Sequence, residues 1–128
     1  MFRLLASAIL PAAVLIALAP LARAQDAAAG QRVFNQCRAC HATASGAKST
    51  LGPNLFGVAG RTAGTLDGFR YSANMKEKGA AGLVWTEETL PPYITNPKQV
   101  VPSGSMAFVG IRNEQQVKDV VAYLATLK

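Results

Sequence analysis

The stretch NQCRACHA, residues 35–42, contains both cysteines of this 128-residue chain and its only histidine. In a helical turn, residues i and i+3 lie on the same face, so Cys37 and Cys40 are expected to point in the same direction. A disulfide between these two thiols would close a very small loop and constrain the unfolded chain very little. It would also leave the adjacent His41 without a role.

The pattern C-x-x-C-H is typical of covalent haem attachment. The two thiols add to the vinyl groups of a haem and form thioethers, and His41 then reaches the iron from one side. A thioredoxin-like redox pair would need a βαβ pattern, which is not visible. A tetrahedral zinc site would need a second pair of soft ligands, which is missing. The sequence therefore predicts one covalently bound haem c, with its iron.

The second axial ligand of this iron is expected to be a methionine, because the chain has no other histidine. Once Met1 is removed with an N-terminal signal, only Met75 and Met106 remain. Met75 lies in a short polar segment, whereas Met106 lies in an irregular segment rich in Gly, Ser and Pro, so we favour Met106. With both axial positions filled by the protein, the haem is expected to transfer electrons rather than act as an enzyme centre.

Residues 1–24 have the composition of a secretory signal peptide, with a basic start, an apolar run and a final Ala-Arg-Ala. Cleavage is expected before Gln25, which leaves residues 25–128 as the haem domain in the periplasm. The alternative is an uncleaved membrane anchor. Pro11 and Pro20 interrupt the apolar run and favour cleavage.

Two terminal helices are predicted. The first runs from about residue 27 to 38 with Asp26 as its N-cap, and the last from 114 to about 127 with Asn113 as its N-cap. The last helix has an apolar stripe formed by Val117, Val120, Val121, Leu124 and Leu127. Gly30 weakens the first helix, so we expect it to allow close approach of another backbone.

Two shorter helices are expected between the terminal ones. One covers residues 72–78 and is expected to end at Gly79, and the other lies within 86–96 and begins at Pro91 after a looser turn. Residues 42–70 show neither helical nor strand periodicity, and six of the eleven glycines lie there. A loop of this length is unusual unless it wraps a large apolar cofactor.

The net charge of +6 comes without a run of Lys or Arg. This distribution argues against nucleic-acid binding. It favours transient docking on an acidic protein surface.

These features resemble class I cytochrome c of the mitochondrial and long-chain bacterial, cytochrome c2-like type. The resemblance covers residues 25–128 and is carried by CRACH (37–41), GPNLFGVAGR (52–61), FRYS (69–72), LVWTEETL (83–90), YITNPKQVVPSGSMAF (93–108) and VVAYLATLK (120–128). It implies an all-α fold in which the N- and C-terminal helices cross, while shorter helices and long loops wrap around one covalent haem c. It also implies a monomeric one-electron carrier in a periplasmic respiratory or photosynthetic chain.

The resemblance implies roles for individual residues. The carbonyl of Pro53 would accept the ring N–H of His41, and Tyr93 would hydrogen-bond near the Met106 sulfur. Phe108 would cover the exposed haem edge. Four residues would surround a buried haem propionate: Arg61, Tyr71, Asn74 and Trp85. Where the terminal helices cross, Gly30 and Phe34 would meet Val120 and Tyr123.

The sequence departs from the resembled family at two places. Gly104 stands where the mitochondrial type has a Thr that bonds a propionate. Several lysine positions around the haem edge are occupied by Gln36, Thr50, Gln99 and Ser105, which leaves Arg38, Lys48, Lys98 and Arg112. Docking is therefore expected to depend less on salt than in a Lys-rich relative.

The expected partners are acidic docking faces of redox proteins such as a cytochrome bc complex, a terminal oxidase, a photosynthetic reaction centre or a dehydrogenase. Two alternatives remain open. One is a dedicated electron acceptor of one dehydrogenase, and the other is a haem sensor or peroxidase in which Met106 dissociates.

Overall fold

The computed structural model of the protein describes residues 24–128. The predicted signal peptide therefore lies outside the described residues, apart from Ala24. The helices are α1 (Ala27–Val33), the 3-10 helix η1 (Phe34–Gln36), α2 (Ala73–Ala80), α3 (Leu90–Thr95), α4 (Pro97–Val100) and α5 (Glu114–Ala125). The part of the chain described contains no strand, only one isolated bridge between Thr62 and Val84. The all-α prediction is confirmed.

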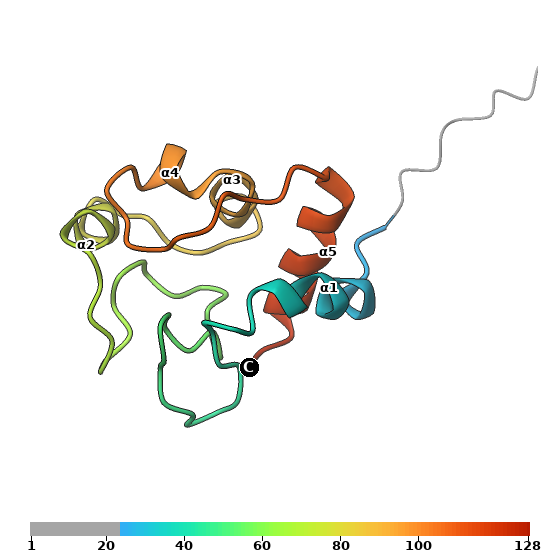
Figure 1. Cartoon of the computed structure of the whole chain (residues 1–128), viewed down its shortest axis with the longest axis horizontal. Coiled ribbons are helices and arrows are strands. Elements are labelled where there is room, and N and C mark those ends of the chain that lie inside the picture. Colours follow the sequence, from blue (N-terminus) through green and yellow to red (C-terminus); the bar gives the residue numbers. More distant parts are fainter. Residues whose placement is uncertain (1–23) are drawn as a thin grey trace, which may run out of the picture.

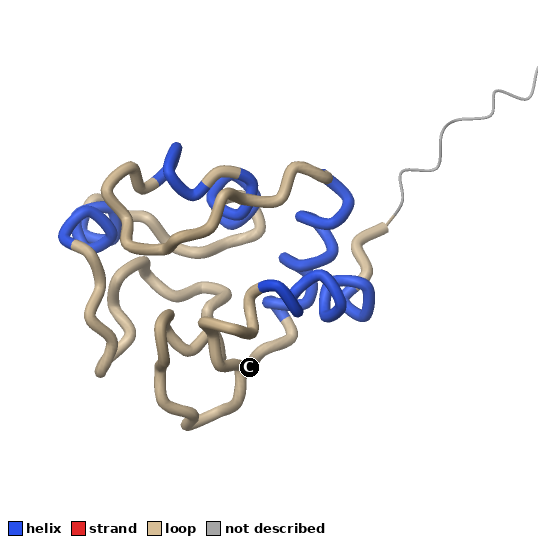
Figure 2. The backbone as a smooth tube through the Cα atoms, in the orientation of Figure 1, coloured by secondary structure: helices blue, strands red, loops and turns tan. Residues whose placement is uncertain are grey.

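The terminal helices lie against each other at one end of the molecule, and α2 lies at the other end (Figure 1). Between them, α3 and α4 follow one edge, and the long glycine-rich loop follows the opposite edge without regular structure (Figure 2). The apolar core lies between these edges. Its buried residues include Phe34, Trp85, Leu90, Val117, Val120 and Leu124.

The predicted caps of the terminal helices are present. The Asp26 carboxylate accepts two N–H groups at the start of α1, and the Asn113 side chain accepts the Gln116 N–H at 3.0 Å. Both caps satisfy backbone donors that lack a partner inside the helix. The first helix is shorter than predicted, because α1 ends at Val33 and only η1 and a turn follow it.

The helix crossing depends on Gly30. A Cβ at this position would lie 1.9 Å from the carbonyl oxygen of Asp119, so only glycine lets α1 approach the α5 backbone this closely. Next to this contact, the rings of Phe34 and Tyr123 pack with centroids 5.1 Å apart. The prediction that Gly30 marks a close backbone approach is confirmed.

Asp119 links the same two helices with its side chain and was not predicted to do so. The residue is only 4% exposed. Its Oδ1 accepts the backbone N–H of Asp26 at 2.9 Å and the side-chain amide of Gln115 at 2.8 Å. A buried carboxylate needs such donors, and here they connect α5 to the start of α1.

The prediction that α2 ends at Gly79 is wrong, because the helix continues to Ala80. Its start is as expected, since Ser72 caps it by accepting the Met75 N–H at 3.1 Å. A Cβ at Gly79 would lie 1.9 Å from the carbonyl oxygen of Ala63. The glycine therefore serves the packing of the long loop on α2 rather than the end of the helix.

The Pro-containing helix α3 begins at Leu90, with prolines in its first turn, close to the predicted start at Pro91. Proline is tolerated there because the first N–H groups of a helix have no intrahelical partner. The short helix α4 follows at Pro97 and was not predicted.

We predict that Gly30→Ala lowers the free energy of unfolding by about 1–3 kcal/mol, because the added methyl group must push α1 away from α5. Urea unfolding of the haem-containing protein, followed by circular dichroism, measures this change. Gln31→Ala on the exposed face of α1 is the control and is expected to change stability by less than about 0.5 kcal/mol. Equal stability of the two variants would contradict the steric role of Gly30.

Candidate functional site

The C-x-x-C-H segment forms a turn directly after η1. The backbone N–H groups of Cys40 and His41 both donate to the Cys37 carbonyl, at 3.1 and 3.0 Å. The turn places all three side chains on the wall of one cavity. The two thiols are not joined in a disulfide. Burial, and then the neighbouring Cys40, raise the pKa of the Cys37 thiol.

A second segment, residues 50–53, lies against this turn. The Thr50 hydroxyl and the Gly52 N–H both donate to the Cys40 carbonyl, each at 2.8 Å. A Cβ at Gly52 would lie 2.4 Å from Cε1 of the His41 ring. The backbone at Gly52 therefore touches the flat face of the imidazole, and a larger residue would displace the ring.

The orientation of His41 is set by Pro53. Nδ1 of the ring lies 2.8 Å from the Pro53 carbonyl oxygen. A carbonyl has no proton to give, so Nδ1 carries the proton and Nε2 keeps its lone pair. Burial lowers the pKa of His41, and the Pro53 hydrogen bond opposes this less strongly. A neutral imidazole with a bare Nε2 is the form that binds a metal.

The cavity beside these residues has a volume of about 420 Å³. Well-packed interiors contain few voids larger than a water molecule, so a space of this size is built to hold another group. Its walls are mostly apolar and include core residues from both ends of the chain. Those core residues are Phe34, Trp85, Leu90, Val120 and Leu124.

Met106 lines the same cavity. It lies in an irregular segment between α4 and α5, as predicted. The Tyr93 hydroxyl donates to the Met106 Sδ at 3.9 Å, and the Tyr93 ring packs on Trp85 with centroids 4.7 Å apart. Burial, and then Tyr71, raise the pKa of Tyr93 to about 12, so its hydroxyl keeps its proton at neutral pH.

Three of the four residues that the resemblance placed near a propionate line the cavity: Arg61, Tyr71 and Trp85. The Arg61 guanidinium donates to the carbonyls of Phe56 and Asn54, at 3.3 and 3.1 Å. Burial raises the pKa of Tyr71, and the nearby Arg61 partly offsets this.

Asn74, the fourth of these residues, is not among those that line the cavity. Its Oδ1 accepts the backbone N–H of Ser103 at 3.0 Å, and its amide group donates to Glu77 at 3.4 Å. Its hydrogen-bond partners thus lie in α2 and in the segment that leads to Met106.

Phe108 lines the cavity, as the resemblance implied. Met75, in the short helix that we expected to be polar, also lines it and is partly buried. The sequence did indicate that this side chain is buried, because Met75 is the only large apolar residue in α2. Pro53 and Gly52 also contribute to the wall.

Among residues 24–128, no group of three or more His, Cys, Asp or Glu could hold a metal ion by itself. Within the same range, no helix is long and apolar enough to cross a membrane.

A family model described as cytochrome c matches residues 27–128. The chain belongs to the cytochrome c family. Among its curated relatives is a cytochrome c2 of Blastochloris viridis, 46% identical over 111 residues, which cover 87% of this chain and 85% of the relative. Another is cytochrome c-550 of Ancylobacter novellus, 46% identical over 99 residues, which cover 77% of this chain and 92% of the relative.

Solved structures of similar proteins share the fold. Ferricytochrome c2 of Rhodopseudomonas palustris is 44% identical with a TM-score of 0.75, and the match covers 81% of this chain and all of that one. Cytochrome cH of Methylobacterium extorquens is 40% identical with a TM-score of 0.72, and the match covers 79% of this chain and 98% of that one. The predicted class I cytochrome c fold is confirmed.

This cytochrome is accordingly a monohaem electron carrier of the respiratory and photosynthetic type, with one covalently bound haem c and its iron. The residues present fit that group. Two thiols one turn apart, an imidazole with a bare Nε2 and a thioether all face one apolar cavity.

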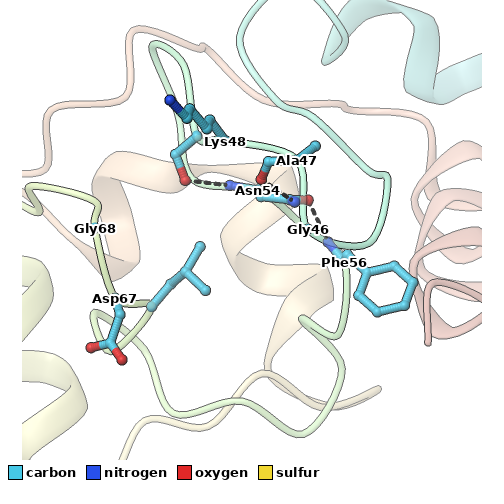
Figure 3. Close-up of a pocket in the computed structure, with 9 residues that line it drawn as sticks. Gly46, Ala47, Lys48, Asn54, Phe56, Asp67 and Gly68 are labelled. Carbon is cyan, nitrogen blue, oxygen red and sulfur yellow. Dashed lines mark hydrogen bonds between the residues drawn. The ribbon is translucent and has the colours of Figure 1, made fainter.

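The cytochrome has a second hollow, of about 510 Å³, between the loop at residues 46–49 and the loop at 66–68. Figure 3 shows Asn54 at its base, hydrogen-bonded to Ala47 and Phe56. The Asn54 amide also reaches the Ala44 carbonyl at 2.8 Å, and the residue is only 7% exposed. Asn54 therefore fixes the shape of the loop that follows the haem-binding motif.

We predict that Asn54→Leu destabilises the cytochrome by about 1–3 kcal/mol, because the loop loses buried hydrogen-bond partners while the side-chain volume is retained. Chemical unfolding of the haem-containing protein measures the change. The same substitution at the exposed Asn35, whose side chain has no hydrogen bond in the structure, is the control. A loss of stability no larger at position 54 than at position 35 would contradict the prediction.

Proposed function

We propose that Cys37 and Cys40 bind the haem through thioethers and that His41 Nε2 and Met106 Sδ are its axial ligands. The observation that carries this proposal is the convergence of all four side chains on one apolar cavity. The haem supplies an iron that gains and loses one electron. The protein holds the group, keeps water from it and fixes the ligands.

Both proposed axial ligands are held in place by contacts from the chain. Pro53 and Gly52 fix the His41 ring, and the Tyr93 hydroxyl holds the Met106 sulfur. Ligands fixed in this way keep the same positions in both oxidation states, so little rearrangement accompanies electron transfer. A thioether ligand also raises the reduction potential.

Arg61, Tyr71 and Trp85 are proposed to surround a haem propionate. Their position on the cavity wall supports this role, because a carboxylate buried in an apolar cavity needs hydrogen-bond donors or a cation. Phe108 is proposed to cover the haem edge. Asn74 is proposed to act on the Met106 segment instead.

The protein is proposed to be a carrier and not an enzyme, because His41 and Met106 leave no open position for a substrate. Addition of carbon monoxide to the reduced protein separates the alternatives. Slow or absent binding supports the carrier, whereas ready binding supports a sensor or peroxidase with a labile Met106. A dedicated acceptor of one dehydrogenase would behave as a carrier in this experiment and would differ only in its partner.

The proposed docking face combines exposed basic residues with exposed apolar ones. Arg38, Lys48, Lys98 and Arg112 are all exposed. Two large apolar residues are exposed as well, Leu51 (81%), which lines the cavity, and Val109 (90%), which follows Phe108. We infer a monomer that docks transiently on acidic faces of a cytochrome bc complex, a terminal oxidase, a reaction centre or a dehydrogenase, with apolar contacts that reduce the salt dependence.

Export to the periplasm is proposed from the signal-peptide pattern of residues 1–24. We predict that protein recovered from the periplasmic fraction has the intact mass of residues 25–128 plus one haem. A mass that includes residues 1–24 would instead indicate a retained anchor.

We predict that Met106→Ala abolishes the near-infrared charge-transfer band that reports sulfur bound to ferric iron, because the chain then lacks its sixth ligand. The optical spectrum of the oxidised protein measures this band. Met75→Leu is the matched control, since it removes the other thioether that lines the cavity. Retention of the band in Met106→Ala, or its loss in Met75→Leu, would overturn the assignment.

A further inference from the structure

The segment that carries Met106 has little backbone support of its own. Within the described chain, no N–H from residues 105–110 donates to a backbone carbonyl. The far end of the segment is fixed on α3, where the Ile111 N–H donates to the Ile94 carbonyl at 3.0 Å. At the near end, the Gly104 N–H donates to the Val101 carbonyl at 3.0 Å, and side chains add further contacts.

Two side chains from other helices hold that near end at consecutive residues. From α2, Asn74 accepts the backbone N–H of Ser103 at 3.0 Å. From α4, the Lys98 ammonium donates to the Gly104 carbonyl. These contacts lie two and three residues before Met106. They hold the segment from outside the cavity, because neither Asn74 nor Lys98 lines it.

We propose that Asn74 and Lys98 form a clamp on residues 103–104 that controls how readily Met106 leaves the iron. This inference rests on the axial role proposed for Met106. Gly104 has no side chain that could hold this part of the segment, and the clamp acts on its backbone instead. Both residues are positioning residues, because they act on the iron only through Met106.

The mechanism is a competition between two positions of one segment. For Met106 to leave the iron, residues 103–106 must shift outward, and the hydrogen bonds of Asn74 and Lys98 oppose this shift. Removing either bond favours the shifted position without altering the cavity wall. An external ligand then binds the iron more tightly, because less free energy is needed to displace Met106.

The test measures how tightly imidazole binds to the oxidised haem-containing protein, followed by loss of the near-infrared sulfur band. Asn74→Leu removes the acceptor with little change in volume, and Lys98→Leu removes the donor. Each is expected to tighten imidazole binding about 2- to 10-fold, the range that corresponds to one net hydrogen bond. Because both bonds hold one segment, the effect of the double variant is expected to depart from the sum of the single effects.

Two controls isolate the clamp. Lys118→Leu removes an exposed cation on α5, and Lys98→Arg keeps a cationic donor at the clamp. Both are expected to bind imidazole within twofold of the unchanged protein. A chemical unfolding curve for each variant separates segment release from global destabilisation. If Asn74→Leu does not fold, the exposed Lys98 still provides the test.

Unchanged imidazole affinity in Lys98→Leu, or an equal change in Lys118→Leu, would overturn the clamp. Failure of the proposed function has a different signature. In that case the sulfur band is missing from the unchanged protein before any imidazole is added.

Discussion

The backbone contact between Gly30 on α1 and Asp119 on α5 fixes the end of the molecule from which the haem-binding turn begins. The chain runs from this contact through η1 into Cys37, so the approach of the two helices determines where the thiols lie. The carboxylate of Asp119 adds a side-chain link to the same contact. Displacement of α1 would move one wall of the cavity relative to the walls formed by α3 and the Met106 segment.

The two sides of the cavity that carry the proposed axial ligands differ in how rigidly they are held. His41 is enclosed by backbone atoms at Gly52 and Pro53, which leave its ring no other orientation. Met106 itself has only the 3.9 Å contact from the Tyr93 hydroxyl, and the exposed hydrogen bonds of Asn74 and Lys98 hold residues 103–104 of its segment. The two proposed ligands therefore differ in how firmly they are held, and the methionine side is the one open to adjustment by substitution.

Sequence patterns predicted those features that depend on neighbouring residues. Asp26 and Asn113 cap their helices as expected, and the C-x-x-C-H spacing, with the long loop that follows it, predicted the haem. Features that depend on contacts between distant residues were missed or misassigned. Gly79 was taken as a helix end although it accommodates the Ala63 carbonyl, and Asn74 contacts Ser103, 29 residues away. Helical or strand periodicity does not reveal such pairs, because neither residue is unusual in the sequence pattern of its own segment.

The two helices that cross come from opposite ends of the polypeptide. During synthesis, α1 is made early, yet the residues that stabilise it appear only among the last ones added. A helix of 7 residues is not stable alone in water. The thiols therefore remain accessible until α5 packs on α1, and the proposed haem attachment can precede closure of the domain around the haem. The order of the elements along the polypeptide thus allows the proposed thioether formation to come before the folding step that buries the haem.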